Sequence, residues 1–130
     1  MVKTINRDDL LIINLVSSKK GFKLVDVLDK EHYEKEHIKG AISLPWNDIE
    51  REAGTVLRKD DLIVVYCASF ECQASTKAAE KLLSMGYKNV LDYKGGLKDY
   101  KEAKLPLEGS LHKGASMTTA NTCSCSSGLL

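Results

Sequence analysis

Residues 61–79, DLIVVYCASFECQASTKAA, contain three consecutive patterns that decide the fold of this chain. Residues 62–66 form a short run of branched and aromatic side chains, which is typical of a buried strand in a parallel sheet. Residues 67–73 have no hydrophobic period and predict a loop. The next apolar residues follow the spacing of one helix face, at Ala74, Ala78, Leu82 and Leu83. We therefore expect a strand, a loop and a helix, with Cys67 at the carboxyl end of the strand.

The position of Cys67 at the end of a strand indicates a chemical role for this loop. In open α/β sheets, ligands bind beyond the carboxyl ends of the strands, and a loop that enters a helix directs free N–H groups toward them. Because a thiolate is an anion, we expect such a loop to favour the ionised form of Cys67 and to make it a nucleophile. The alternative from position alone is a small buried side chain that caps the strand.

The composition is that of one soluble domain. The chain has 130 residues, of which 43% are hydrophobic and 28% are charged. Nineteen basic and eighteen acidic residues give a net charge of +1, which argues against nucleic acid or an anionic membrane as a partner. The sequence has no apolar run long enough for a membrane span, and residues 1–10 lack the apolar core of a signal peptide. We therefore expect a cytoplasmic protein that binds no nucleic acid and no membrane.

The four cysteines form two close pairs, Cys67 with Cys72 and Cys123 with Cys125. This spacing differs from the spread of cysteines in a secreted domain that is held by disulfides. The three histidines show no ligand spacing relative to either pair, so zinc is not indicated. We expect neither a metal nor another cofactor.

The rest of the chain alternates predicted helices with short predicted strands, which indicates a parallel α/β sheet. Besides the segment after the loop, helices are predicted for about ten residues after Asn6 and over 30–35, 46–53 and 97–103. Strands are predicted over 22–27, 41–44 and 89–91. Residues 109–130 are rich in Ser, Thr, Gly and Ala, so we expect one domain over 1–108 and a polar, flexible tail over 109–130.

Several short motifs stand in a fixed order: LVDV (24–27), HIKGAI (37–42), LP (44–45), VVYC (64–67), GYKNV (86–90), GGL (95–97) and LP (105–106). Together they resemble a single-domain rhodanese over residues 4–108. The resemblance implies a three-layer α/β domain with a central parallel β-sheet flanked by helices. It also implies that Cys67 is the cysteine that carries a persulfide, and that Gly95 and Gly96 form a turn beside the active-site mouth.

The resemblance implies a sulfurtransferase reaction in two steps. The Cys67 thiolate attacks the outer sulfur of a small donor, such as thiosulfate or a persulfide, and cyanide, a thiol or an acceptor protein then removes that sulfur. Asp26 matches the acidic residue of the family's first strand motif, either as a support that binds backbone amides near the loop or as a direct participant. The backbone of the loop would stabilise negative charge. Its residues are Ala68, Ser69, Phe70, Glu71, Cys72 and Gln73.

The loop departs from the family pattern Cys-x-x-Gly-x-Arg-Ser, whose arginine holds an anionic substrate. Phe70 stands at the glycine position and Cys72 at the arginine position, and the loop is longer than usual when the following helix is aligned. Leu28 replaces a second arginine that commonly follows the Asp-Val motif. Lys77 and Lys94 are the candidates for the missing charge, although a lysine offers a point charge without the arginine fork.

These departures leave other functions open. A rhodanese module without the arginines can serve as a persulfide carrier, a redox sensor or a protein-binding domain. Cys72 can act as a resolving thiol toward an oxidised or persulfidated Cys67, which predicts a Cys67/Cys72 reductase of disulfides or arsenate. Glu71 opposes a thiolate if it lies close to the sulfur. Phosphoryl transfer is disfavoured, because it needs an arginine at the end of the loop.

Overall fold

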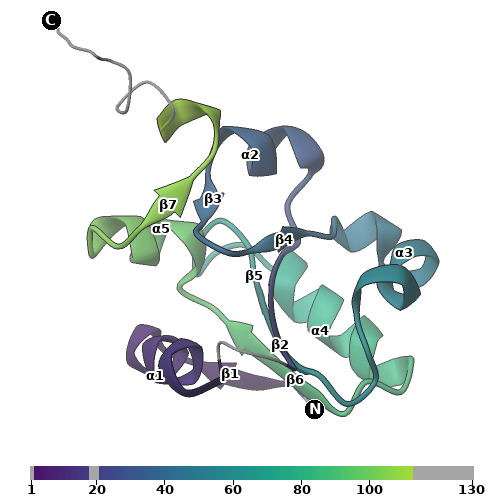
Figure 1. Cartoon of the computed structure of the whole chain (residues 1–130). Coiled ribbons are helices and arrows are strands. Elements are labelled where there is room, and N and C mark those ends of the chain that lie inside the picture. Colours follow the sequence, from purple (N-terminus) through teal and green to yellow (C-terminus); the bar gives the residue numbers. More distant parts are fainter. Residues whose placement is uncertain (1, 18–20, 113–130) are drawn as a thin grey trace, which may run out of the picture.

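Five parallel strands form the centre of the molecule (Figure 1). They are β1 (Lys3–Ile5), β2 (Phe22–Asp26), β4 (Ile42–Ser43), β5 (Leu62–Tyr66) and β6 (Asn89–Tyr93). Their order across the sheet is β1-β6-β5-β2-β4, so the predicted central strand β5 lies in the middle. A separate antiparallel pair joins β3 (His37–Ile38) to β7 (Leu107–Glu108). This computed structural model describes residues 2–17 and 21–112.

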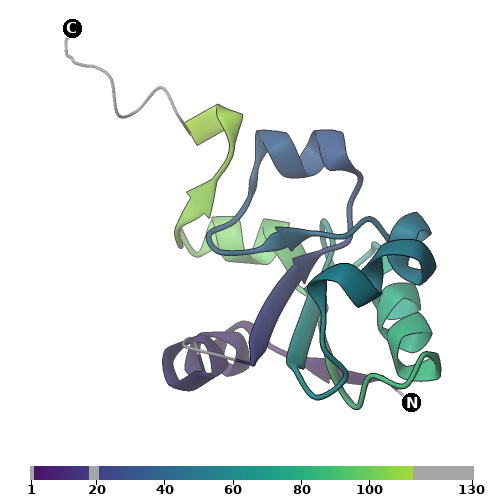
Figure 2. The same cartoon turned by 45° about the vertical axis from the view of Figure 1, so that its right-hand side comes forward.

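Helices cover both faces of the sheet (Figures 1 and 2). They are α1 (Arg7–Ser17), α2 (Lys30–Lys35), α3 (Ile49–Val56), α4 (Ala74–Ser84) and α5 (Gly96–Glu102). Helices α3 and α4 pack on one face, and α1 and α5 pack on the other. The predicted three-layer α/β fold with a central parallel sheet is therefore confirmed. None of the helices in the described ranges is long and apolar enough to cross a membrane.

Strand β5 is buried on both of its faces, as its composition predicts. Ile63 and Val65 point into the core under α3 and α4, and Val64 and Tyr66 point into the core under α1 and α5. All four side chains are fully buried. Because side chains alternate along a strand, the residue after Tyr66, Cys67, returns to the α3 and α4 side.

Several predicted elements have the expected positions. Helix α2 spans the predicted residues 30–35, and Asp29 Oδ1 accepts a 3.0 Å hydrogen bond from the His32 N–H at its start. Helix α4 begins at residue 74, directly after the predicted loop. Asn6 caps α1, because its Oδ1 accepts a 2.8 Å bond from the Asp9 N–H.

Other predictions differ from the structure in their bounds or pairing. The helix predicted over 46–53 is a 3₁₀ turn, Trp46–Asp48, followed by α3, which continues past Gly54 to Val56. A helical glycine costs about 1 kcal/mol, and burial of Ile49 and Ala53 on the sheet side outweighs that cost. The predicted turn at residues 37–40 starts with strand β3, whose partner β7 lies about 70 residues further along the chain. Strand β1 was not predicted.

The fold continues beyond the predicted domain boundary at residue 108. Residues Ser110–His112 form a 3₁₀ turn, and His112 Nε2 lies 2.9 Å from Oε2 of Glu36, next to α2. A Cβ at Gly109 would lie 2.4 Å from the carbonyl oxygen of Lys35, so this contact requires a glycine. The rest of the predicted tail, residues 113–130 with Cys123 and Cys125, lies outside the described residues.

Candidate active site

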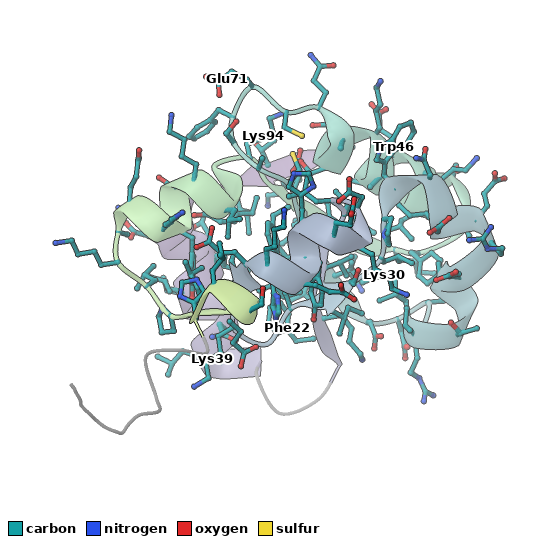
Figure 3. The ribbon with its side chains drawn as sticks, turned by 90° about the horizontal axis from the view of Figure 1, so that it is seen from above. Phe22, Lys30, Lys39, Trp46, Glu71 and Lys94 are labelled. Atoms are coloured by element: carbon teal, nitrogen blue, oxygen red, sulfur yellow. The ribbon has the colours of Figure 1, made fainter. Side chains whose placement is uncertain are left out.

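The predicted site lies at the carboxyl end of β5, where the loop of residues 67–73 connects the strand to α4. Figure 3 looks down on this edge of the sheet, with Glu71 of the loop and Lys94 labelled. Cys67 is only 1% exposed, whereas Cys72 is half-buried. Both residues pack against the core that α3 and α4 cover, and both thiols are free.

The first residues of α5 bind the first two residues of the loop through backbone hydrogen bonds. The Leu97 N–H donates to the carbonyl oxygen of Cys67 at 2.9 Å, and the Lys98 N–H donates to that of Ala68 at 2.8 Å. Gly96 makes this approach possible, because a Cβ there would lie 2.4 Å from the Cys67 oxygen. The predicted placement of this glycine turn beside the site agrees with these contacts. They fix the backbone of the loop where it leaves the strand.

The Cys67 sulfur faces inward toward the loop. It lies 3.4 Å from the carbonyl oxygen of Cys72 and 3.5 Å from Oγ of Ser75, which is itself fully buried. Burial raises the pKa of the Cys67 thiol, and the neighbouring Cys72 sulfur raises it further, against smaller opposing effects of the Ser75 hydroxyl and N–H. The prediction that the loop favours an ionised Cys67 is therefore wrong for the resting site. Desolvation outweighs the hydrogen bonds that reach this sulfur.

Cys72 differs from Cys67 in its surroundings, because two backbone N–H groups of the loop favour its ionised form. Burial opposes ionisation of this side chain as well, but donors outweigh burial, so the pKa of the Cys72 thiol is below its ordinary value. The groups that lower it are the Cys67 side chain, the N–H groups of Ala74 and Ala68 and the Lys94 charge. The pKa shifts of the two thiols thus have opposite directions, and the loop favours the ionised form of Cys72 over that of Cys67.

Lys94 supplies positive charge at the loop. Its Nζ donates to the carbonyl oxygen of Cys72 at 3.3 Å and to Oγ1 of Thr76 at 3.2 Å. Thr76 in turn donates to Oδ2 of the buried Asp92 at 2.7 Å. Lys77, the other candidate, lies with its Nζ 5.7 Å from the centre of the Trp46 ring, away from these contacts. Lys94 is thus the predicted lysine that contacts the loop.

The remaining loop residues face outward. Ala68, Phe70, Glu71 and Gln73 are exposed, and Phe70 is 63% exposed. Ser69 Oγ donates to Glu71 Oε1 at 2.9 Å, and this bond lowers the pKa of the Glu71 carboxyl. The Glu71 side chain is exposed and lies at the outer edge of the molecule (Figure 3). Repulsion of a thiolate by Glu71, which the sequence left open, is small in this arrangement.

Asp26 lies at the end of β2, beside the end of β5, and is fully buried. Its Oδ1 accepts from the Leu28 N–H at 2.9 Å and its Oδ2 accepts from the Tyr66 hydroxyl at 2.8 Å. Burial raises the pKa of the Asp26 carboxyl, and these hydrogen bonds only partly offset the effect. Tyr66 Oη also accepts from the Ile38 N–H at 3.0 Å. These contacts join β2, β5 and β3 and are those of a positioning residue.

A family model for the rhodanese-like domain matches residues 13–103. This chain belongs to the rhodanese-like domain family. It is 40% identical over 94 residues to the thiosulfate sulfurtransferase PspE of Escherichia coli K12, covering 69% of this chain and 88% of that protein. It is 35% identical over 103 residues to the adenylyltransferase and sulfurtransferase UBA4 of Candida albicans, covering 72% of this chain but only 23% of that protein.

A putative sulfur carrier protein of Bacillus subtilis, YrkF, is 32% identical over 85 residues, which is 65% of this chain and 44% of that protein. Among solved structures, the BH2092 protein of Bacillus halodurans matches with a TM-score of 0.76 and 33% identity, over 84% of this chain and 78% of that chain. The predicted family is confirmed. These curated relatives are named as sulfurtransferases and as a putative sulfur carrier.

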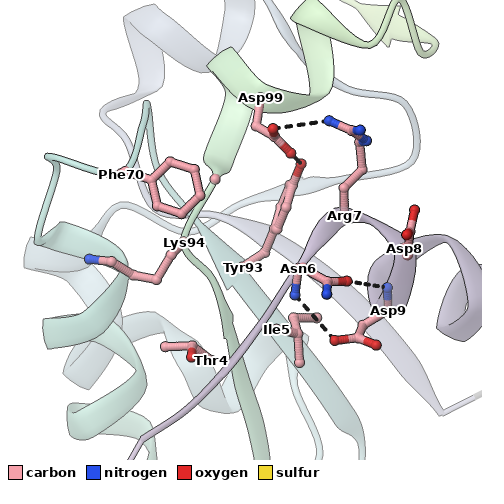
Figure 4. Close-up of a pocket in the computed structure, with 11 residues that line it drawn as sticks. Thr4, Ile5, Asn6, Arg7, Asp8, Asp9, Phe70, Tyr93, Lys94 and Asp99 are labelled. Atoms are coloured by element: carbon pink, nitrogen blue, oxygen red, sulfur yellow. Dashed lines mark hydrogen bonds and ion pairs between the residues drawn. The ribbon is translucent and has the colours of Figure 1, made fainter.

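A pocket of about 560 Å³ borders the loop of this rhodanese-like domain (Figure 4). Phe70 and Lys94 line it on the loop side, and the start of α1 lines it on the other. Arg7 contributes to the pocket, but its guanidinium is paired with Asp99 at 3.0 Å, and the Tyr93 hydroxyl donates to the same carboxylate at 2.6 Å. This arginine therefore does not replace the missing arginine of the loop.

Sequence reasoning missed three polar residues of the rhodanese site: Ser75, Thr76 and Asp92. Ser75 and Thr76 lie in the first turn of α4, where side chains face the strand ends. Asp92 is the charged residue within the mostly apolar strand β6, and that contrast was an available signal. Within the part of the chain that the structure describes, no three acidic, cysteine or histidine side chains gather as a metal site.

Proposed function

We propose that this domain transfers sulfane sulfur from a small donor, thiosulfate or a persulfide, to a thiol, cyanide or an acceptor protein through a persulfide on Cys67. The observation that supports this proposal best is the position of Cys67 at the end of β5, with Cys72 beside it in the loop. The Cys67 sulfur lies 3.4 Å from the carbonyl oxygen of Cys72, and the N–H groups of Ala74 and Ala68 lower the pKa of the Cys72 thiol. A proton acceptor thus lies next to a buried thiol at the position that the family uses for sulfur transfer.

The first step requires a Cys67 thiolate. Cys72 takes the proton of Cys67, and the Ser75 hydroxyl and N–H, which already face the Cys67 sulfur, stabilise the charge. Cys67 then attacks the outer sulfur of the donor. A new S–S bond forms, and the donor's own sulfur bond breaks, so that sulfite or a thiolate leaves with the electron pair. Because Cys67 is 1% exposed, the loop around Cys72 has to move aside for this attack.

The second step returns the domain to its starting state. An acceptor thiolate or cyanide attacks the outer sulfur of the Cys67 persulfide, and the Cys67 thiolate is the leaving group. Cys67 then regains its proton from Cys72. Lys94 Nζ, bound to the Cys72 carbonyl oxygen, offsets negative charge from donor and thiolate in both steps. In this scheme Cys72 takes over proton transfer, and Lys94 supplies part of the charge of the absent arginine.

A cyanolysis assay tests the proposal. The parent chain is expected to form thiocyanate from thiosulfate and cyanide, and Cys67→Ser is expected to reduce the rate to background. Circular dichroism of both proteins shows whether the substituted chain is folded. Lys77→Met is a control outside the loop contacts and should keep the parent rate. Equal rates for the parent and Cys67→Ser would exclude sulfur transfer through this residue.

A persulfide carrier is the second candidate. The burial of Cys67 favours it, because a buried persulfide is protected from thiols in solution. Stable addition of one sulfur atom to Cys67 after treatment with a donor, without catalytic turnover, would support the carrier over the enzyme. For either function we propose a reducing compartment such as the cytoplasm, where both thiols stay reduced, and no role for nucleic acid or membrane.

A further inference from the structure

We propose that Cys67 and Cys72 form a redox pair in which Cys72 resolves a persulfide on Cys67, leaving an internal disulfide and releasing hydrogen sulfide. The inference rests on the proposed function for its first step, the formation of the Cys67 persulfide. It adds a second product to that function. Without an acceptor, the domain reduces sulfane sulfur to sulfide.

The backbone brings the two thiols together. The Cys72 N–H donates to the carbonyl oxygen of Ser69 at 3.1 Å, and this turn folds the loop back over the end of β5. As a result the Cys67 sulfur lies 3.4 Å from the carbonyl oxygen of Cys72 itself. Cys67 and Cys72 also pack against the same core. The two residues of the proposed disulfide are therefore neighbours before the reaction begins.

The charges favour Cys72 as the attacking group. The N–H groups of Ala68 and Ala74 and the charge of Lys94 lower the pKa of its thiol, and Lys94 Nζ lies 3.3 Å from the Cys72 carbonyl oxygen. In a persulfide, the inner sulfur is an electrophile that a thiolate can attack. The inner sulfur here is Cys67 Sγ, which lies 3.4 Å from the same carbonyl oxygen.

The reaction balances without another oxidant. The Cys72 thiolate forms an S–S bond with Cys67 Sγ, and the bond between Sγ and the outer sulfur breaks. The proton that Cys72 took from Cys67 moves to the outer sulfur, which leaves with the electron pair as HS⁻, so it is reduced while the two cysteine sulfurs are oxidised. A dithiol reductant, either a small molecule or a protein, must then open the disulfide before the next cycle.

A single-turnover experiment tests this inference on the full chain. The reduced protein is mixed with sodium thiosulfate under anaerobic conditions, without cyanide or added thiol, and sulfide is measured. The chain is then alkylated in acid and digested with trypsin. Cleavage after Lys59 and Lys77 puts both thiols into one peptide, residues 60–77, separate from Cys123 and Cys125 in residues 114–130.

The parent is expected to release one equivalent of sulfide per chain, and its peptide 60–77 to lose two hydrogen atoms and resist alkylation. Cys72→Ser and Cys72→Ala remove the resolving thiol and the proton acceptor of the first step, but not Cys67. After long incubation they are expected to gain one sulfur atom on this peptide, more slowly than the parent reacts, and to release no sulfide. The parent without thiosulfate must stay fully alkylated.

The outcomes separate the two proposals. If the parent keeps the added sulfur without a disulfide or sulfide, the redox pair is refuted while the sulfurtransferase proposal stands. If folded Cys72→Ala and Cys72→Ser gain no sulfur and the parent gives neither product, the persulfide on Cys67 is refuted, and the redox pair with it.

Discussion

Replacing Gly96 by alanine should detach the loop from α5. Gly96 has a φ of +66°, a left-handed conformation that costs a residue with a Cβ about 1–2 kcal/mol. The new Cβ would also lie 2.4 Å from the carbonyl oxygen of Cys67 and 3.0 Å from the backbone of Ala68, a contact that neither backbone segment can relieve without moving. We expect the two hydrogen bonds between α5 and the loop to break as these segments move apart.

The size of the loss follows from these contacts. The bonds from Leu97 to Cys67 and from Lys98 to Ala68 are 2.9 and 2.8 Å long, and each contributes about 1 kcal/mol. Together with the left-handed cost, Gly96→Ala should lower the free energy of unfolding by about 3–4 kcal/mol. Gly40→Ala is a matched control, because Gly40 has a φ of +87° but no atom within 4 Å of an added Cβ. It should lose only about 1–2 kcal/mol.

Urea unfolding followed by circular dichroism measures both variants, and thiosulfate cyanolysis of the folded proteins reports on the loop. Gly96→Ala is expected to lose more stability than Gly40→Ala by about 2 kcal/mol, and to transfer sulfur more slowly at urea concentrations where it is still folded. Equal losses of stability in the two variants would refute the reasoning, because the close approach between Gly96 and the loop would then carry no energy.

Three other outcomes are expected. Lys94→Met should raise the KM for thiosulfate about tenfold, equivalent to one charged hydrogen bond, whereas Lys77→Met should leave it unchanged. Asp61 is buried, yet bonds from a backbone N–H at 2.9 Å and a lysine at 3.2 Å hold the pKa of its carboxyl below the usual value. A lowered folded pKa gives stability at neutral pH that is lost in acid, so urea unfolding of Asp61→Asn should show a loss of about 1–3 kcal/mol near pH 7 and a smaller one near pH 3. Because the pKa of the Cys72 thiol is lowered and that of Cys67 is raised, iodoacetamide at neutral pH should label Cys72 first, and peptide mapping that finds Cys67 labelled first would contradict this order.

The sequence predicted the elements whose signals are local. The continuous apolar run of β5 and the helical spacing of α4 need no distant partner to be recognised, and together they place Cys67 at the strand end. Strands β3 and β7 have two residues each and are defined only by their pairing across the chain, so no periodicity can reveal them. Strand β1, three residues long and paired with β6, was missed for the same reason.

The sequence predicted where the loop lies but not the charge inside it. It gave Cys67 as the nucleophile, Cys72 as an open alternative, and Lys77 and Lys94 together as candidates for positive charge. Which sulfur receives the amides depends on the conformation of the loop, and α5, about 30 residues away in the sequence, fixes where that loop begins. Burial of Cys67 depends on the whole core under α3 and α4. The partner of the loop amides and the burial of Cys67 both depend on distant segments. The local sequence therefore could not predict them, and the prediction of an ionised Cys67 failed.

The position of Cys72 creates a competition that a loop with an arginine does not have. An arginine keeps its charge at any physiological pH and leaves the backbone amides free for an anionic donor. In this loop the N–H groups of Ala68 and Ala74 already stabilise the ionised form of Cys72 and lower the pKa of its thiol. A donor anion that approaches them must displace a thiolate or meet its charge, unless that thiolate has first taken the proton of Cys67. Transfer of this proton from Cys67 to Cys72 therefore has two effects. It neutralises Cys72, so that the nearby N–H groups can bind a donor anion, and it converts Cys67 into the thiolate that attacks the donor.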